Sequence, residues 1–189
     1  MSTLVLVRHA EPVDDMRGRC YGSLDVELSE QGHAQARELA ERLTERYDAV
    51  YSSPRVRALE TAQPLAAEVH VDERLREIDF GEFEGRTYEE IARTEPKLFR
   101  AWMETPTQVR FPGGESYADV RRRALAAYDE IRAAHDCAVV VAHGGVIRAG
   151  LAAWLGMPDE SIFRLGQRYC GVSIVDWVGE TPVVRLVNG

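Results

Sequence analysis

Cysteine is scarce in this sequence of 189 residues, and long apolar runs are absent. The three cysteines, Cys20, Cys137 and Cys170, have no Cys-X-X-Cys spacing, which argues against a zinc knuckle. Their odd number argues against a disulfide framework, so we expect free thiols in a reducing compartment. No segment approaches the ~20 apolar residues of a membrane helix, and no basic leader opens the sequence. We therefore expect a cytoplasmic protein without membrane contact.

Positive charge is also in deficit, because 23 lysines and arginines face 31 aspartates and glutamates, a net charge of −8. Such a surface repels nucleic acid and anionic lipid, so we expect no nucleic-acid partner. A local basic site is still compatible with a negative net charge. No Gly-X-Gly-X-X-Gly segment follows the first predicted strand, which argues against dinucleotide binding. The expected partner is a small molecule.

Short apolar runs alternate with helical patterns along the chain. The predicted strands are residues 4–7, 49–51, 69–71, 138–142, 172–176 and 183–186. The predicted helices are 30–43, capped by Ser29, then 54–66, 87–104 with a break near Pro96, 117–134, capped by Ser116, and 144–155. This alternation predicts one α/β domain over residues 1–189 with a mostly parallel sheet. Ligands of such sheets bind at the carboxyl ends of the strands.

The helix predicted over 54–66 has a proline at its start. Pro54 suits the first helical position, where no backbone N–H is needed. Helical spacing predicts that its buried face consists of Val56, Leu59, Ala62, Leu65 and Ala66.

Reactive and phosphate-binding residue types follow three of these strands. Arg8-His9 ends the first, Arg55 and Arg57 follow the second, and His143-Gly144-Gly145 ends the strand over 138–142. Any one of them alone is more typical of a structural or surface residue. Together at one sheet edge they suit a phosphate dianion, which arginine forks and the Gly144 and Gly145 amides at a helix start would bind. Two histidines there suggest that one attacks phosphorus while the other donates to its oxygens.

A leaving alcohol also needs a proton donor. Glu77 lies in a semi-apolar turn, a setting that favours the protonated form of a carboxyl group. Asp79, Glu82 and Glu84 are rivals that spacing alone does not exclude.

Five motifs in order resemble those of the histidine phosphatase superfamily, which includes the cofactor-dependent phosphoglycerate mutases. They are Arg8-His9-Ala10-Glu11, the segment from Gly18 to Gly32, Ser52 to Ala62, Leu75 to Gly85, and Val141 to Gly145. The resemblance implies a three-layer α/β/α sandwich around a six-stranded sheet with one antiparallel strand. It also implies a metal-independent reaction without an organic cofactor.

The same resemblance assigns roles to individual residues. It implies that His9 is the nucleophile and forms a phosphohistidine, that His143 is the second histidine and that Glu77 is the proton donor. Arg8 and Arg57 become phosphate ligands, and Arg57 is preferred to Arg55 because it directly precedes Ala58-Leu59-Glu60-Thr61-Ala62.

The chain departs from the family pattern in the loop after the first strand. Pro12 stands where many members have threonine, and Asp15 where many have asparagine. These changes predict either weaker phosphate binding or a contact of Asp15 with a substrate hydroxyl. Tyr21 and Gly22 are further candidates for substrate binding. Residues 86–115 are the expected lid or specificity segment.

The predicted function is therefore hydrolysis of a small phosphomonoester. Mutase-type phosphoryl transfer is an alternative, although the chain is too short for the insertions that mutases of the family carry. A catalytically weak regulatory or binding module is another. The segment Phe111 to Ser116 resembles the alpha-ribazole phosphatase and broad-specificity phosphatase branch.

Overall fold

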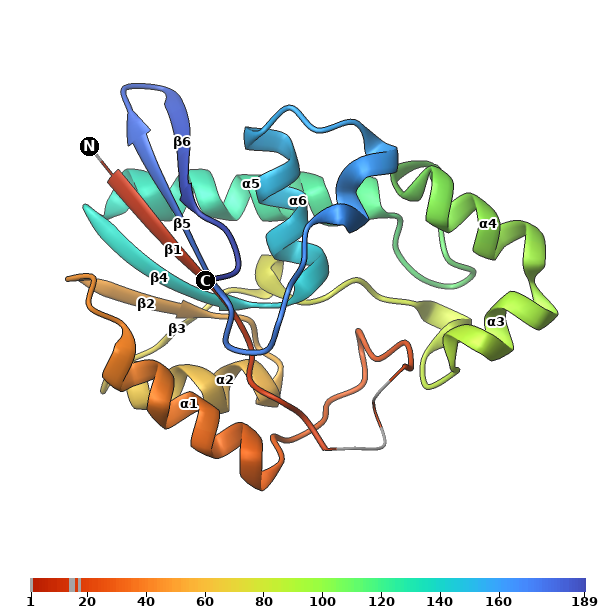
Figure 1. Cartoon of the computed structure of the whole chain (residues 1–189), viewed down its shortest axis with the longest axis horizontal. Coiled ribbons are helices and arrows are strands. Elements are labelled where there is room, and N and C mark those ends of the chain that lie inside the picture. The colour runs from red at the N-terminus through yellow and green to blue at the C-terminus, as the bar shows by residue number, and fades with distance from the viewer. Residues whose placement is uncertain (1, 14–15, 17) are drawn as a thin grey trace.

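The computed structural model describes residues 2–13, 16 and 18–189, and in this part of the chain six strands form one sheet (Figure 1). The strands are β1 (Ser2–Arg8), β2 (Ala49–Ser52), β3 (His70–Val71), β4 (Cys137–Ala142), β5 (Val172–Val178) and β6 (Thr181–Leu186), in the order β3-β2-β4-β1-β5-β6. The β1, β2, β3 and β4 pairs are parallel, whereas β5 is antiparallel to both β1 and β6. The mostly parallel six-stranded sheet with one antiparallel strand is confirmed.

Helices cover both faces of this sheet, which gives the predicted three layers (Figure 1). The α-helices are α1 (Glu30–Arg42), α2 (Val56–Ala62), α3 (Tyr88–Thr94), α4 (Pro96–Glu104), α5 (Tyr117–Ala134) and α6 (Gly144–Trp154). On one face α1 and α2 pack with Val5 and Val7 of β1, and on the other α5 and α6 pack with Leu4 and Leu6. This alternation follows from the two-residue period of a strand. No helix in the described residues is both long and apolar enough to cross a membrane.

The helix starts use the side chains that the sequence offers. Ser29 accepts a hydrogen bond from the Gly32 amide at the start of α1. Ser116 and Asp119 form a reciprocal capping box at the start of α5. The break predicted near Pro96 separates α3 from α4, and Pro96 begins α4. Both helices lie beyond one end of the sheet (Figure 1).

The α2 helix differs from its prediction. It begins at Val56 with Arg55 as its cap, so Pro54 precedes the helix. Its buried residues are Arg57, Ala58, Thr61 and Ala62, whereas Val56 and Leu59 are only partly buried. The reason is hydrogen bonding: both terminal nitrogens of Arg57 donate to backbone carbonyls, and the Thr61 hydroxyl accepts from the Ala10 amide at 2.9 Å. The helix can bury this polar face because its polar groups have hydrogen-bond partners, so the purely apolar face is not favoured over it.

Strand register brings three chain segments to one edge of the sheet. Arg8 of β1 pairs with Ala142 of β4, so the next residues, His9 and His143, leave adjacent strands side by side. The Ser53 amide donates to the Val141 carbonyl at 3.0 Å, so the end of β2 lies at the same edge. The candidate site thus lies at the carboxyl edge of the sheet, as expected for a parallel sheet.

Candidate active site

The two histidines at this edge are buried and close together. His9 is 2% exposed and His143 is inaccessible, and their ring centroids are 5.1 Å apart. Burial lowers the pKa of both imidazoles well below the usual range, and the positive charges of Arg57 and Arg8 lower it further. Both rings are therefore neutral near pH 7.

Hydrogen bonding determines which nitrogen of His9 is reactive. Its Nδ1 lies 2.7 Å from the backbone carbonyl of Ala10. Because a carbonyl only accepts, Nδ1 must donate, and Nε2 then carries the lone pair. Nε2 of His9 is thus the ring nitrogen with a free lone pair, as the predicted nucleophile requires.

His143 has a partner that the sequence reasoning did not identify as functional. Its Nε2 lies 2.7 Å from Oγ of Ser53, a fully buried hydroxyl. Ser53 Oγ already accepts from the Arg55 amide at 3.3 Å, so its own hydrogen is available to donate to His143. When the Ser53 hydroxyl donates to Nε2, the proton of a neutral His143 stands on Nδ1, a buried atom without a hydrogen-bond partner among the described residues. His143 is thereby prepared to donate a hydrogen bond.

Arg57 is fully buried and anchored by the loop that follows β1. Its Nη1 donates to the Leu24 carbonyl at 2.8 Å, and its Nη2 donates to the carbonyls of Tyr21 at 2.9 Å and Gly22 at 3.2 Å. Arg8 is held similarly, since its Nη1 donates to the Gln167 carbonyl. Within the described residues, Nε of each arginine is buried without a hydrogen-bond partner. These fixed cations suit the oxygens of a phosphoryl group.

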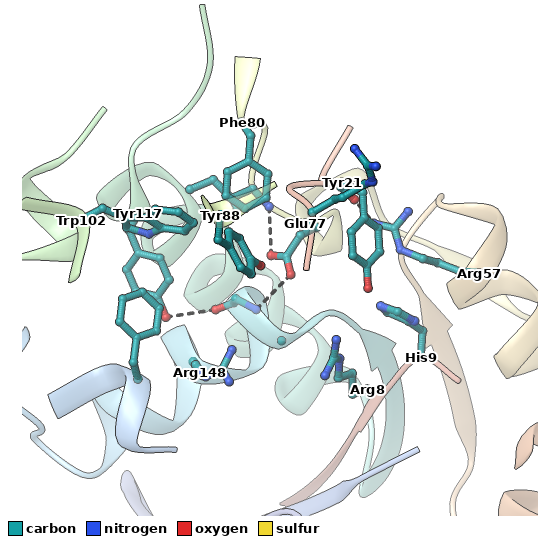
Figure 2. A pocket seen from close by; sticks show the side chains of 15 residues that line it. Arg8, His9, Tyr21, Arg57, Glu77, Phe80, Tyr88, Trp102, Tyr117 and Arg148 are labelled. Carbon is teal, nitrogen blue, oxygen red and sulfur yellow. Dashed lines mark hydrogen bonds between the residues drawn. The ribbon is translucent and has the colours of Figure 1, made fainter. Parts of the chain in front are cut away.

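Each of these arginines also lies over a tyrosine ring. The Arg57 guanidinium carbon is 4.9 Å from the Tyr21 centroid, and that of Arg8 is 4.4 Å from the Tyr169 centroid. The Tyr21 ring is edge-on to His9, and its hydroxyl points toward this histidine in Figure 2. Burial raises the pKa of Tyr21, so its hydroxyl remains a neutral donor. Tyr169 was not predicted, because it lies in an irregular segment without a recognisable motif.

Glu77 lines the cavity together with His9, and Figure 2 shows its carboxyl group between Tyr21 and Tyr88. Its Oε2 accepts from the Gly145 amide at 3.1 Å and its Oε1 from the Ile78 amide at 3.0 Å. A Cβ at position 145 would lie 2.4 Å from Oε1, so glycine is needed there for this approach. We expected the Gly145 amide to face an anion, but it donates to Glu77 instead.

Comparison with known proteins agrees with this geometry. The model of the histidine phosphatase superfamily (branch 1) matches residues 4–189. The chain belongs to this superfamily. The match confirms the predicted family and the prediction of an enzyme that hydrolyses phosphate esters.

Two curated relatives and one solved structure illustrate the likeness. Phosphoserine phosphatase 1 of Hydrogenobacter thermophilus is 38% identical over all of this chain and 92% of its own length. The metal-independent phosphoserine phosphatase of Arabidopsis thaliana is 36% identical over 79% of this chain and 67% of its own. The phosphoserine phosphatase of Entamoeba histolytica, solved with 3-phosphoglyceric acid, has a TM-score of 0.90 and 28% identity, covering 100% of this chain and 98% of that one.

The rival carboxylates of this histidine phosphatase have other partners or positions. Glu84 accepts from the amides of Ser23 and Phe80, and Asp79 accepts from the Gly81 amide. Glu82 is exposed. Among the described residues that line the cavity, Glu77 is the only carboxylate.

An arginine outside the cavity holds the Glu77 segment of the phosphatase. Arg123 of α5 donates to the carbonyls of Arg74 at 2.7 Å, Arg76 at 2.6 Å and Glu77 at 3.1 Å. Its charge is paired with Glu115, at 2.8 Å. The backbone of the acid segment is therefore fixed against a long helix.

Of the other predicted site residues, some line the cavity and others do not. Gly144 is the first residue of α6 and lines the cavity. Gly22 packs against the backbone of Ile78, since a Cβ there would lie 1.5 Å from the Ile78 carbonyl oxygen. It thereby lets the loop after β1 approach the Glu77 segment. Asp15 lies outside the described residues, and Arg55 does not line the cavity.

The cavity of the phosphatase has a volume of about 130 Å³, is open to solvent and extends from His9 toward aromatic side chains. Its outer wall includes Phe80, Tyr88, Trp102, Tyr117 and Phe163 (Figure 2 draws all 15 lining residues). Tyr88 and Trp102 come from α3 and α4, within the segment 86–115.

Proposed function

We propose that this chain hydrolyses the phosphate ester of a small carboxylic acid through a phosphohistidine on His9. The proposal is carried by one observation: the Ala10 carbonyl accepts a hydrogen bond from Nδ1 of a neutral, buried imidazole. The lone pair of this imidazole is therefore on Nε2, near two anchored arginines. A neutral imidazole with a fixed tautomer is a competent nucleophile, and the arginines neutralise the group that it attacks.

In the first step, Nε2 of His9 attacks phosphorus and the ester P–O bond breaks. Arg8, Arg57 and Nδ1–H of His143 stabilise the phosphoryl oxygens as charge redistributes. Glu77 gives its proton to the departing alkoxide, so the products are an alcohol and a phosphorylated His9.

In the second step, water attacks phosphorus and the P–N bond breaks. Glu77, now a carboxylate, takes the proton from this water and returns to its acid form, while inorganic phosphate leaves. The hydrogen bonds from the Gly145 and Ile78 amides keep the carboxyl group in place through both steps.

Substrate size and charge narrow the class of ester. The relatives described above are named for phosphoserine, and one was solved with 3-phosphoglyceric acid. Both molecules carry a carboxylate close to the phosphate ester. A cavity of about 130 Å³ resembles the ~150 Å³ space that holds a benzene ring, so it suits a compact ester. A nucleoside-sized ester such as alpha-ribazole phosphate would extend beyond it.

The segment 86–115 is proposed to cover the alcohol part of the substrate. Trp102 is 7% exposed and belongs to the hydrophobic core, yet it also lines the cavity. Tyr88 lines the same wall and is 43% exposed. A wall of this kind excludes water from the ester oxygen while leaving an opening for exchange.

We also propose a reducing, cytoplasmic location. Cys20, Cys137 and Cys170 are all free thiols, and two of them are buried. Burial raises the pKa of each of the three, which keeps them as unreactive thiols.

The decisive test is chemical trapping of the phosphoenzyme. Wild-type protein mixed with ³²P-labelled phosphoserine and quenched in base should carry label that acid releases. His9→Ala should carry none and should lose turnover, whereas His33→Ala, which changes an exposed histidine, should behave as wild type. Turnover of His9→Ala near the wild-type rate would reject the mechanism. Recovery of label in a second phosphate ester would indicate mutase-type transfer.

A further inference from the structure

Arg148 is a cavity residue that the proposed chemistry does not use. It lies on α6, one helical turn after Gly144. Its Nε donates to the Leu165 carbonyl at 2.9 Å, which anchors the side chain and leaves both terminal nitrogens for other partners. It lines the cavity, and Figure 2 shows its guanidinium below Tyr88 with Arg8 to its right.

Glycine at position 144 opens a direct path from this guanidinium to the phosphate site. The point where a Cβ would stand is 3.1 Å from Nη1 of Arg148 and 3.8 Å from Nε of Arg8. Gln167 borders the same point, with its Cβ at 3.8 Å. Gln167 is 8% exposed, and its Nε2 has no hydrogen-bond partner among the described residues. Donors of two arginines and the side chain of Gln167 thus border a point where Gly144 has no side chain.

Glu77 is the acidic residue whose charge acts on Arg148, and it does so without an ion pair. No described carboxylate forms an ion pair with Arg148, and the one carboxylate lining the cavity, Glu77, already accepts from two amides. A phosphate dianion would neutralise Arg8 and Arg57 but not a third cation. Burial lowers the pKa of Arg148, which reflects the cost of holding this charge away from water. A guanidinium nevertheless stays protonated, so an anionic ligand would recover that cost.

We infer that Arg148 is the specificity residue of this enzyme and binds a carboxylate that the substrate carries close to its phosphate ester. The inference rests on the proposed function, because it places the carboxylate relative to a phosphoryl group held by Arg8. The terminal nitrogens of Arg148 form charge-assisted hydrogen bonds to the carboxylate, and the short path past Gly144 selects a carboxylate within a few bonds of the ester oxygen. Esters of neutral alcohols bind the phosphate site alone.

The test compares substrates that differ only in this group. Glycerol 3-phosphate is 3-phosphoglycerate with a hydroxymethyl group in place of the carboxylate, and phosphoethanolamine is phosphoserine without it. The wild-type enzyme should prefer the acid of each pair. Arg148→Met should lower kcat/KM for the acids by about 10- to 100-fold, the usual effect of losing a hydrogen bond to a charged group. It should leave glycerol 3-phosphate within about twofold of the wild-type value, since the phosphate site is intact, and it should not lower kcat/KM for phosphoethanolamine, whose ammonium group Arg148 would repel.

Two further variants separate charge from structure. Arg148→Lys keeps the cation and should retain part of the preference. Arg164→Met removes an exposed arginine next to the cavity residue Phe163 and should leave all four rates unchanged. Equal losses on acids and carboxylate-free esters in Arg148→Met, or no loss on either, would overturn the inference.

The same experiment distinguishes this inference from the proposed function. If the wild-type enzyme forms phosphohistidine but hydrolyses both members of each pair equally, only the role of Arg148 is wrong. If it forms no phosphohistidine from any of them, the proposed mechanism itself is wrong.

Discussion

Oγ of Ser53 lies 2.7 Å from Nε2 of His143, although 90 residues separate the two in the chain. A serine hydroxyl that donates to Nε2 places the proton of a neutral histidine on Nδ1, where it can be donated to a phosphoryl group. We therefore propose that Ser53 is a positioning residue that acts through His143.

The first prediction concerns this pair. Ser53→Ala should lower kcat by roughly 10²-fold with a smaller effect on KM, since a transition-state donor loses its orientation. Ser53→Thr keeps the hydroxyl and should recover part of the rate. Ser52→Ala is the matched control, because the Ser52 hydroxyl donates only to the Ser53 carbonyl. The measurement is steady-state kinetics with p-nitrophenyl phosphate. A Ser53→Ala enzyme as active as Ser52→Ala would remove this role.

The second prediction compares two neighbouring arginines. Arg57→Ala should lower kcat/KM by about 10²-fold or more and weaken vanadate inhibition, because it removes a fixed cation from the phosphate site. It should also lower the melting temperature, since the carbonyls of Tyr21, Gly22 and Leu24 lose their donors. Arg55→Ala should affect inhibition much less. The reverse order would show that the two arginines have been exchanged in our assignment.

The third prediction separates the acid and base steps of Glu77. In Glu77→Gln, p-nitrophenyl phosphate should still phosphorylate His9 quickly, because its leaving group has a pKa of about 7 and needs little protonation. Release of inorganic phosphate should then be slow, so rapid-quench kinetics should show a burst approaching one equivalent. An alkyl phosphate should show none.

Gly145→Ala gives an independent check of the same group. The new Cβ would stand 2.4 Å from Oε1 of Glu77 and displace the carboxyl group. Its turnover of alkyl phosphates should fall more than its phosphorylation by p-nitrophenyl phosphate. Equal losses on both substrates, in this variant and in Glu77→Gln, would transfer the role to another carboxylate.

The fourth prediction follows from the two neutral histidines. The pKa values of His9 and His143 are lowered in the folded protein, first by burial and then by arginine charges. Below about pH 6.5 the unfolded chain therefore binds more protons than the folded one, and the free energy of unfolding falls as the pH falls. The loss is up to about 1.4 kcal/mol per pH unit for each histidine.

Urea unfolding between about pH 7.5 and pH 5.5 measures this slope. His9→Asn and His143→Asn should each flatten it, whereas His33→Asn, at an exposed position, should not. An identical slope in all four proteins would contradict the assignment of buried neutral imidazoles.

The fifth prediction is that turnover survives removal of divalent metal. Arg8, Arg57 and His143 supply the positive charge and donors that a metal ion provides in metallophosphatases. Dialysis against EDTA should leave kcat/KM unchanged. Loss of activity that zinc or magnesium restores would require a metal-assisted reaction.

The sequence by itself determined the strands, most helix starts and the residues at the strand ends. Apolar runs such as Leu4 to Val7 and Ala138 to Ala142 are local signals, and so are the caps Ser29 and Ser116. Parallel neighbours end at one edge of a sheet, so the meeting of His9 with His143 could be anticipated from these runs. The choice of Glu77 among four acidic residues came from the family resemblance.

Only the tertiary structure decided which polar atoms meet. Ser53 with His143, Gly145 with Glu77 and Arg148 with the space beside Gly144 depend on register and on backbone approach to within tenths of an ångström. Residue type and spacing do not encode such distances, because each contact is formed by segments that other elements hold in place. For the same reason α2 buries Arg57 rather than its more apolar side: the terminal nitrogens of Arg57 donate to carbonyls of a loop more than 30 residues away in sequence.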